Sequence, residues 1–170
     1  FLWPIGLALL AILIATTLSW PLRIRAVLHH WGMRLSFIAA AVAIPGLTVS
    51  LLKFIVGRAR PEAAGSTGIL DITGFNLDAD FQSFPSGHTT NAITLAIALT
   101  VLWPRYWVFF LSFPIVIAVS RVMTLDHYPS DTVGAWLFGA AGVLWIRNWC
   151  ARRKLVFAPR ADGRIVRRRL

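Results

Sequence analysis

Five long apolar segments constrain this sequence more than any other feature. They span residues 2–19, 35–56, 86–103, 106–122 and 132–146. A helix that crosses about 30 Å of hydrocarbon needs roughly 20 mostly apolar residues. In the helices of a soluble protein, polar residues recur with a period of 3.6 and form one polar face. Ile93–Leu102 and Phe109–Val119 contain almost no polar residues. The pattern predicts an all-α fold, a polytopic membrane helical bundle with five transmembrane helices.

Composition agrees with a membrane environment. The chain is 57% hydrophobic and 14% charged, whereas soluble domains are nearer half apolar and a quarter charged. A net charge of +10 would also suit a nucleic-acid-binding protein. However, nine of the 17 basic residues lie between Arg147 and Arg169, and no basic stripe follows a soluble helix, so nucleic acid is not an expected partner. Cys150 is the only cysteine, which excludes an intrachain disulfide and a cysteine-based metal cluster.

Charges between the apolar segments predict an orientation. If the segments cross alternately, 13 of the 17 basic residues fall on one side, which the positive-inside rule makes cytoplasmic. The other four lie on the outer side, with six of the seven acidic residues; they are Lys53, Arg58, Arg60 and Arg121. We expect a transmembrane domain over residues 1–148 and a basic cytoplasmic tail over residues 149–170. These four outer cations depart from the positive-inside rule, so we expect the functional site on the outer side.

Three polar clusters reach the outer face, each beside the end of an apolar segment. The first runs from Lys53 to Pro61, the second is Pro85-Ser86-Gly87-His88, and the third runs from Ser120 to Asp131. The expected topology gathers their cations, histidines and one carboxylate into one layer, namely Lys53, Arg60, Arg121, His88, His127 and Asp131. This combination suits an oxyanion site with acid–base groups. Phosphoryl transfer needs little more than such positioning and neutralisation of charge.

Each residue type has a physical reason to be in such a site. An arginine fork can hold two phosphate oxygens, and Ser86 and Gly87 open a helix whose N-terminus favours an anion. Asp131 follows His127 by four residues and would hold one imidazole nitrogen, leaving the other more basic, with His88 as a general acid. Three nearby cations argue against a metal site.

Two neighbouring charges are expected to play no part in this site. Arg58 lies within the first cluster but has no motif position, and we expect its side chain to be solvated. Asp126 precedes His127 and should point elsewhere if His127 faces the site. Between the first two clusters, residues 62–84 carry several apolar side chains. We favour a folded loop with its own small core there; the alternative is a loop at the membrane interface that guides lipid tails.

Together, the three clusters resemble the type 2 phosphatidic acid phosphatase superfamily. Its motifs are Lys-x6-Arg-Pro, Pro-Ser-Gly-His and Ser-Arg-x5-His-x3-Asp, and all occur here in order without a mismatch. The resemblance implies that His127 forms a phosphohistidine, Asp131 orients it and His88 protonates the leaving oxygen. It further implies that the phosphate is held without metal or cofactor by Lys53, Arg60, Arg121 and the backbone at Ser86 and Gly87. Membrane members commonly have six spans, so a sixth would precede Phe1 or be absent.

The expected function is that of a metal-independent membrane lipid phosphatase, acting on a phosphate monoester or pyrophosphate. Candidate substrates are a polyprenyl pyrophosphate, phosphatidylglycerophosphate, phosphatidic acid and a lipid A phosphate. The compact chain favours a bacterial envelope lipid, and hence the bacterial inner membrane with the site facing the periplasm. Two alternatives stay open: a vanadium haloperoxidase, which shares the motifs but is larger and soluble, and an anion channel or transporter, which leaves the paired histidines unexplained.

Overall fold

The computed structural model describes residues 3–17, 20–64 and 68–167, and over these residues the chain is mainly helical. Its five α-helices are α1 (Trp3–Thr17), α2 (Leu22–Val56), α3 (Gly87–Leu102), α4 (Trp107–Met123) and α5 (Pro129–Arg152). Short 3₁₀ turns occupy Gly68–Leu70, Ala79–Phe81 and Pro104–Tyr106. An antiparallel hairpin of β1 (Phe157–Pro159) and β2 (Ile165–Arg167) ends the described chain. Helices are found at the five predicted segments, and the hairpin was not predicted.

Two helices in the described part of the chain are long and apolar enough to cross a membrane. They are Leu22–Val56 and Pro104–Met123, while Gly6–Ala15 and Gly87–Leu102 are apolar but shorter. Helix α2 begins at Leu22, so His29 and His30 lie on a helix and not in the loop expected between the first two segments. Residues 2, 18 and 19 of the first expected segment, and residues 168–170 of the expected tail, lie outside the described residues.

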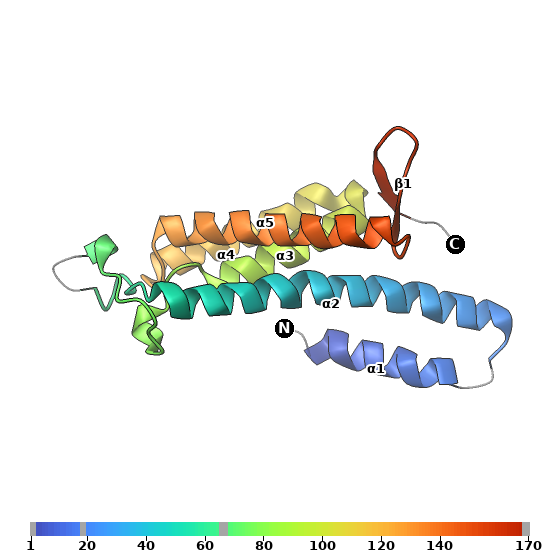
Figure 1. The fold of residues 1–170 in the computed structure, drawn as a ribbon, viewed down its shortest axis with the longest axis horizontal. Coiled ribbons are helices and arrows are strands. Elements are labelled where there is room, and N and C mark those ends of the chain that lie inside the picture. Colours follow the sequence, from blue (N-terminus) through green and yellow to red (C-terminus); the bar gives the residue numbers. More distant parts are fainter. Residues whose placement is uncertain (1–2, 18–19, 65–67, 168–170) are drawn as a thin grey trace.

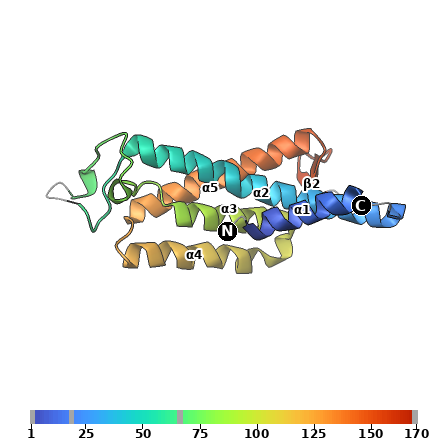
Figure 2. The ribbon, with the colours of Figure 1, turned by 90° about the horizontal axis from the view of Figure 1, so that it is seen from below.

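The helices pack lengthwise around α3. Helix α3 contacts α2, α4 and α5, and α1 lies beside the N-terminal half of α2 (Figures 1 and 2). The described loop residues 57–64, 68–86 and 124–128 meet at one end of the bundle, which we call the loop end (Figure 1). The hairpin lies at the other end, the hairpin end. All three predicted motifs therefore reach the loop end.

Small residues on α5 let its neighbours approach closely. A Cβ added at Gly139 would lie 2.7 Å from the Ile93 side chain of α3. One added at Gly142 would lie 2.6 Å from the ring of Pro45 on α2. Real Cβ atoms are not found at such distances, so both packings depend on glycine. This close contact fixes the start of α5, which carries Asp131 of the third motif, relative to the other helices.

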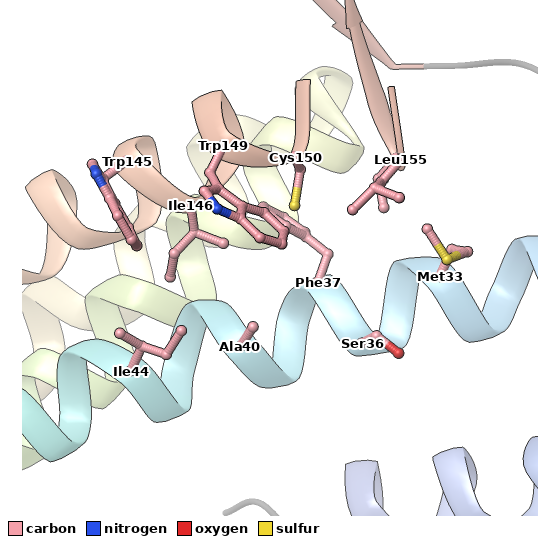
Figure 3. A pocket seen from close by; sticks show the side chains of 11 residues that line it. Met33, Ser36, Phe37, Ala40, Ile44, Trp145, Ile146, Trp149, Cys150 and Leu155 are labelled. Atoms are coloured by element: carbon pink, nitrogen blue, oxygen red, sulfur yellow. The ribbon is translucent and has the colours of Figure 1, made fainter. Parts of the chain in front are cut away.

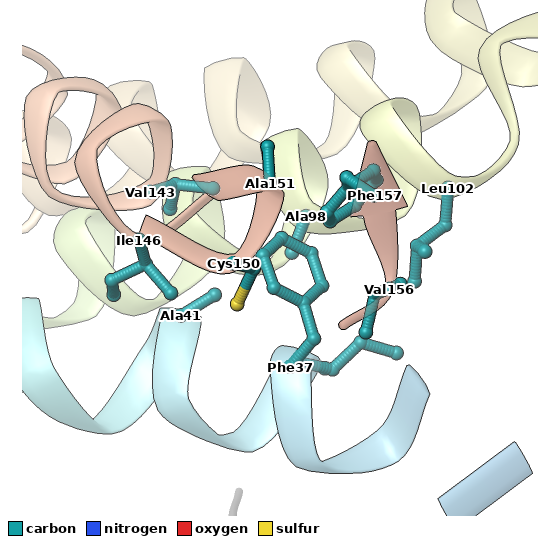
Figure 4. Packing of buried hydrophobic residues seen from close by; sticks show 11 residues of the cluster. Phe37, Ala41, Ala98, Leu102, Val143, Ile146, Cys150, Ala151, Val156 and Phe157 are labelled. Atoms are coloured by element: carbon teal, nitrogen blue, oxygen red, sulfur yellow. The ribbon is translucent and has the colours of Figure 1, made fainter. Parts of the chain in front are cut away.

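At the hairpin end, a hydrophobic cluster joins the hairpin to the helices. Phe157 of β1 is buried and meets Phe37 of α2 edge to face, with ring centroids 4.9 Å apart (Figure 4). Cys150 is buried in the same cluster. Helix α5 continues through residue 148 to Arg152. The expected division at residue 149 thus falls inside a helix, and residues 157–167 of the expected tail are folded against the bundle.

An apolar pocket of about 470 Å³ lies between α2 and α5, toward the hairpin end. Its lining includes Met33 and Ile44 from α2, and Trp145 and Trp149 from α5 (Figure 3). None of the motif residues contributes to it. The pocket is therefore separate from the predicted site.

The segment between the first two motifs does not form the small core that we favoured. Its large apolar side chains are mostly exposed, in particular Ile69, Leu70, Ile72, Phe75 and Leu77. Phe75 touches Phe54 of α2, with ring centroids 5.7 Å apart. Most of this apolar surface has no cover within the described chain. A loop of this kind at the end of an apolar bundle fits contact with the membrane interface better than a separate core.

Candidate active site

The first motif ends α2 and turns the chain back toward the bundle. Lys53 lies in the last turn of α2, and Gly57 follows the helix with φ of 59°. A Cβ at Gly57 would lie 2.8 Å from the backbone nitrogen of Gly74, so both the conformation and the space require glycine here. Arg58 then pairs with Ile72 in an isolated β-bridge. The glycine therefore directs the next residues into the loop end instead of prolonging the helix.

The second motif begins α3 beside Lys53. Ser86 occupies the N-cap position as predicted, but its hydroxyl makes no capping bond and accepts a hydrogen bond from Thr89. The Lys53 ammonium donates to the carbonyl of Gln82 at 2.5 Å, and a Cβ at Gly87 would lie 3.6 Å from Lys53 Cε. The first N–H groups of a helix have no carbonyl partner within it. The start of α3 thus offers them to an anion next to a lysine.

Asp131, in the first turn of α5, connects the three motifs. Its side chain is fully buried; one carboxylate oxygen accepts from Arg58 at 2.5 Å, and the other from Ser83 at 2.6 Å and the Tyr128 amide at 2.9 Å. Its backbone carbonyl accepts from the Ser86 amide at 3.1 Å. That amide is consequently occupied and is not free to bind a phosphate oxygen, as we expected of the Ser86 backbone.

The environment of Asp131 keeps its carboxyl group ionised. Burial acts to raise its pKa, but contact with His127, the hydrogen bonds from Ser83 and Tyr128, and the charge of Arg58 outweigh this effect. The resulting pKa lies below the ordinary value. At neutral pH the carboxylate is therefore charged and is paired with the Arg58 guanidinium.

His127 lies in the loop between α4 and α5 and is 4% exposed. Its Nδ1 faces Ser83 Oγ at 3.4 Å and Asp131 Oδ2 at 3.7 Å. Because the Ser83 hydroxyl donates to Asp131, its oxygen can accept a hydrogen bond from the N–H group at Nδ1. The carboxylate that we expect to orient His127 thus reaches the imidazole largely through Ser83. This arrangement leaves Nε2 as the ring nitrogen available for chemistry.

Two predicted phosphate-binding arginines converge on one acidic residue. Arg60 and Arg121 each lie 3.2 Å from a different carboxylate oxygen of Asp126. A hydrogen bond from Thr124 is the largest cause of a lowered Asp126 pKa, and the two arginine charges also lower it. The expectation that Asp126 points away from the site is wrong, because the loop turns its carboxylate between the arginines. The Nε of Arg121 is buried and has no hydrogen-bond partner in the described residues.

His88 is exposed at the first turn of α3. It makes no hydrogen bond or ion pair with any residue that the structure describes. The charges of Arg121, His127 and Lys53 act on its imidazole, so it stands within electrostatic range of the other motif residues. A free imidazole facing solvent near an arginine, a lysine and a second histidine is placed to exchange protons with a bound group.

The arrangement has the chemistry of an anion site. Lys53, Arg60 and Arg121 supply positive charge, and the start of α3 adds free N–H groups. Within the described ranges, no group of three or more His, Cys, Asp and Glu side chains could hold a metal ion. These donors suit phosphate oxygens better than a cation.

The comparison with known families agrees with this geometry. The profile of the PAP2 superfamily matches residues 34–155, which include every motif residue. The chain belongs to the PAP2 superfamily. This confirms the resemblance found in the motifs. No solved structure matches the chain significantly.

The curated relatives of this PAP2 chain include bacterial proteins that are named as phosphatases. A lipid A 1-phosphatase of Rhizobium etli is 37% identical over 135 residues, which cover 79% of this chain and 58% of that protein. A second, from Rhizobium johnstonii, is 36% identical over 79% of this chain and 55% of its own length. A putative undecaprenyl-diphosphatase of Escherichia coli is 35% identical over 79% of this chain and 69% of that protein. The chain thus spans a little more than half of the two lipid A 1-phosphatases.

Sequence reasoning missed two residues that support the PAP2 site. Arg58 is buried, which overturns the expectation of a solvated side chain; it also donates to Ser130 at 2.9 Å and stacks on the Tyr128 ring, 4.4 Å from its centroid. One signal pointed to it, because it is among the few basic residues on the side expected to lack them. Ser83 is fully buried, and no signal in the sequence marked it.

The Arg58–Asp131 pair gives a direct prediction. Replacing Arg58 with Gln leaves a buried carboxylate without its countercharge, which typically costs roughly 3–5 kcal/mol of stability. We expect Arg58→Gln to lower the midpoint of thermal unfolding and to reduce kcat strongly, because Asp131 no longer has a fixed position. Arg105→Gln, at an exposed arginine of the hairpin end, is the matched control and should change neither. Wild-type kcat and thermal stability in Arg58→Gln would contradict this role.

Proposed function

We propose that this chain is an integral membrane lipid phosphatase that works without metal through a phosphohistidine intermediate. The arrangement of His127 carries the proposal. Its Nδ1 is engaged by Ser83 and Asp131, while Arg60 and Arg121 converge close by on a carboxylate. A ring nitrogen left free beside paired arginines suits attack on a phosphate. The names of the curated relatives support the same class of reaction.

In the first step, Nε2 of His127 attacks phosphorus and forms a P–N bond. The P–O bond to the leaving group breaks, its electron pair stays on the leaving oxygen, and protonated His88 gives that oxygen a proton. The proton on Nδ1 stays hydrogen-bonded to Ser83, whose own hydroxyl points to Asp131. The negative carboxylate therefore stabilises the positive charge that develops on the imidazole.

In the second step, a water molecule attacks the phosphohistidine. His88 takes a proton from this water, the P–N bond breaks, and its electron pair returns to Nε2. Lys53, Arg60, Arg121, the Ser86 hydroxyl and the Gly87 amide hold the phosphate oxygens through both steps. Phosphoryl transfer depends mainly on such positioning and charge neutralisation, and here side chains and the start of α3 supply it.

The substrate is proposed to be a bacterial envelope lipid whose phosphate lies at headgroup depth. Relatives named for lipid A and for undecaprenyl diphosphate favour these two substrates over phosphatidic acid and phosphatidylglycerophosphate. The exposed apolar loop over residues 68–77 supports this proposal, because it lies at the same end of the bundle as the motif residues and exposes apolar side chains that can enter the lipid interface.

Phosphate release from purified chain in detergent tests the activity and the substrate together. We expect hydrolysis of lipid A or undecaprenyl diphosphate, full activity in excess EDTA, and strong inhibition by vanadate, which mimics pentacoordinate phosphorus. His127→Asn is the control for contaminating phosphatases. Activity that disappears on chelation and returns with magnesium would contradict the metal-free mechanism, and no release from any phosphorylated lipid would contradict the function.

We further propose that all five helices span the bacterial inner membrane, with the loop end in the periplasm and the hairpin end in the cytoplasm. Two long apolar helices and the 13-to-4 division of basic residues support this arrangement. Single cysteines at Ala63 and Ala161, both exposed positions, should report it in a Cys150→Ser background. On intact cells, an impermeant thiol reagent should label position 63 and spare position 161. The opposite labelling would reverse the orientation.

The two histidines should respond differently to the leaving group. His127→Ala removes the nucleophile, so nearly all activity should be lost with every substrate. His88→Ala removes a proton donor, which is typically worth about 10²–10⁴-fold. That loss should shrink for p-nitrophenyl phosphate, because its leaving group departs without protonation. The check is kcat for aryl and alkyl phosphates in both variants; rescue at position 127 and not at 88 would mean that the two roles are reversed.

A further inference from the structure

A buried arginine at the hairpin end has no anionic partner. Arg34 of α2 is 9% exposed, and its Nε is buried without a hydrogen bond. Across residues 3–17, 20–64 and 68–167, its guanidinium makes neither a hydrogen bond nor an ion pair. Buried charges in proteins are normally paired, because removing a charge from water without compensation is costly.

Aromatic rings and further positive charge surround Arg34. Its guanidinium carbon lies 5.2 Å from the ring centroid of Trp31 and 6.0 Å from that of Trp103, and the two rings stack on each other. Arg167 lies close enough for its charge to act on Arg34, and His30 is affected by both arginines. One N–H group of the Arg167 guanidinium donates a hydrogen bond to the carbonyl of Leu102, at the end of α3, at 2.6 Å.

Contact with the two tryptophans offsets only part of the free-energy cost of burying the unpaired charge of Arg34. A cation–π contact contributes roughly 0.5–2 kcal/mol, whereas burying an unpaired charge costs more. The neighbouring positive groups repel one another and add to the cost. Nearly all the acidic residues lie toward the loop end, and Asp162 of the hairpin already pairs with Arg160. The described chain therefore lacks the anion that this cluster requires.

The position of Arg34 on α2 indicates where the anion comes from. Nineteen residues along one continuous helix separate Arg34 from Lys53 of the candidate site. At 1.5 Å per residue they are about 28 Å apart, close to the thickness of about 30 Å of a bilayer's hydrocarbon. When Lys53 lies at one headgroup layer, Arg34 lies at the other. Tryptophans beside it suit the same depth.

We propose that Arg34, Arg167 and His30 form a binding site for the phosphate of an anionic phospholipid, in the leaflet opposite the candidate active site. Trp31 and Trp103 would flank the headgroup, and the guanidinium of Arg34 would donate to its phosphate oxygens. The bound lipid would hold the hairpin and the ends of α2 and α3 together from the membrane side. The proposal does not depend on the phosphatase activity, because the two sites lie at opposite ends of α2.

Lipid binding to the purified full chain in detergent tests this site. Phosphatidylglycerol is the probe, since it is an anionic phosphodiester and not a phosphate monoester. Phosphatidylcholine with the same acyl chains is the comparison, because the positive groups would repel its choline. Native mass spectrometry gives the affinity and thermal unfolding gives the stabilisation, each for wild type, Arg34→Met and Arg153→Met. Arg153 is the matched control, an exposed arginine over a tryptophan at the same end, 4.0 Å from the Trp149 centroid.

We expect Arg34→Met to weaken phosphatidylglycerol binding at least about tenfold. This is the change in affinity that corresponds to the loss of one or more hydrogen bonds from a charged donor. Arg153→Met should bind like wild type, and phosphatidylcholine should not distinguish the three proteins. Without lipid, Arg34→Met should unfold at the same temperature as wild type or higher, because it no longer buries an unpaired charge. Equal phosphatidylglycerol affinity in Arg34→Met and wild type would overturn the proposal.

Two further measurements keep the test decisive. If Arg34→Met does not fold, Arg167→Gln removes the neighbouring charge instead, and an unchanged preference for phosphatidylglycerol would then overturn the site. Inorganic phosphate separates a lipid from a free anion. Stabilisation by inorganic phosphate that is absent from Arg34→Met would overturn the assignment to a lipid. Stabilisation by phosphatidylglycerol alone would support it.

Discussion

The buried ion pair between Arg58 and Asp131 is the interaction on which the candidate site depends. Arg58 comes from the chain that leaves α2, and Asp131 comes from the first turn of α5. The carboxylate also holds Ser83 and the Tyr128 amide, and its backbone carbonyl holds the amide that starts α3. Three helix ends thus share one residue. A shift of Asp131 would move His127, the start of α3 and the loop over residues 58–60 together.

Such a pair is more useful for geometry than for stability. The free-energy cost of removing a carboxylate and a guanidinium from water offsets most of their attraction. A protein with a well-packed apolar pair at these positions could therefore be equally stable. An apolar pair could not direct Ser83 toward His127 or keep negative charge behind the imidazole. The close helix packing at Gly139 and Gly142 supports the same geometry, because it fixes the axis of α5 on which Asp131 lies.

The sequence predicted the parts of this molecule that depend on local pattern. Apolar runs marked the five helices, and the spacing from Lys53 to Asp131 marked the residues that converge at the loop end. It could not predict what depends on the path of the loops. Arg58 was expected in solvent and Asp126 outside the site, because an isolated charge in a loop carries no sign of its partner. Ser83 gave no signal, since a serine before a proline-rich turn is common.

In the proposed mechanism, Asp126 affects how a phosphate enters and leaves. Its carboxylate pairs with the same two arginines, Arg60 and Arg121, that are proposed to hold the phosphate. Phosphate binding then exchanges one anion for another. When the phosphate leaves, the Asp126 carboxylate can pair with the arginines again. Part of the attraction between the arginines and the substrate is thereby cancelled. An enzyme that must release inorganic phosphate after every turnover gains speed from such a weakened hold on its product.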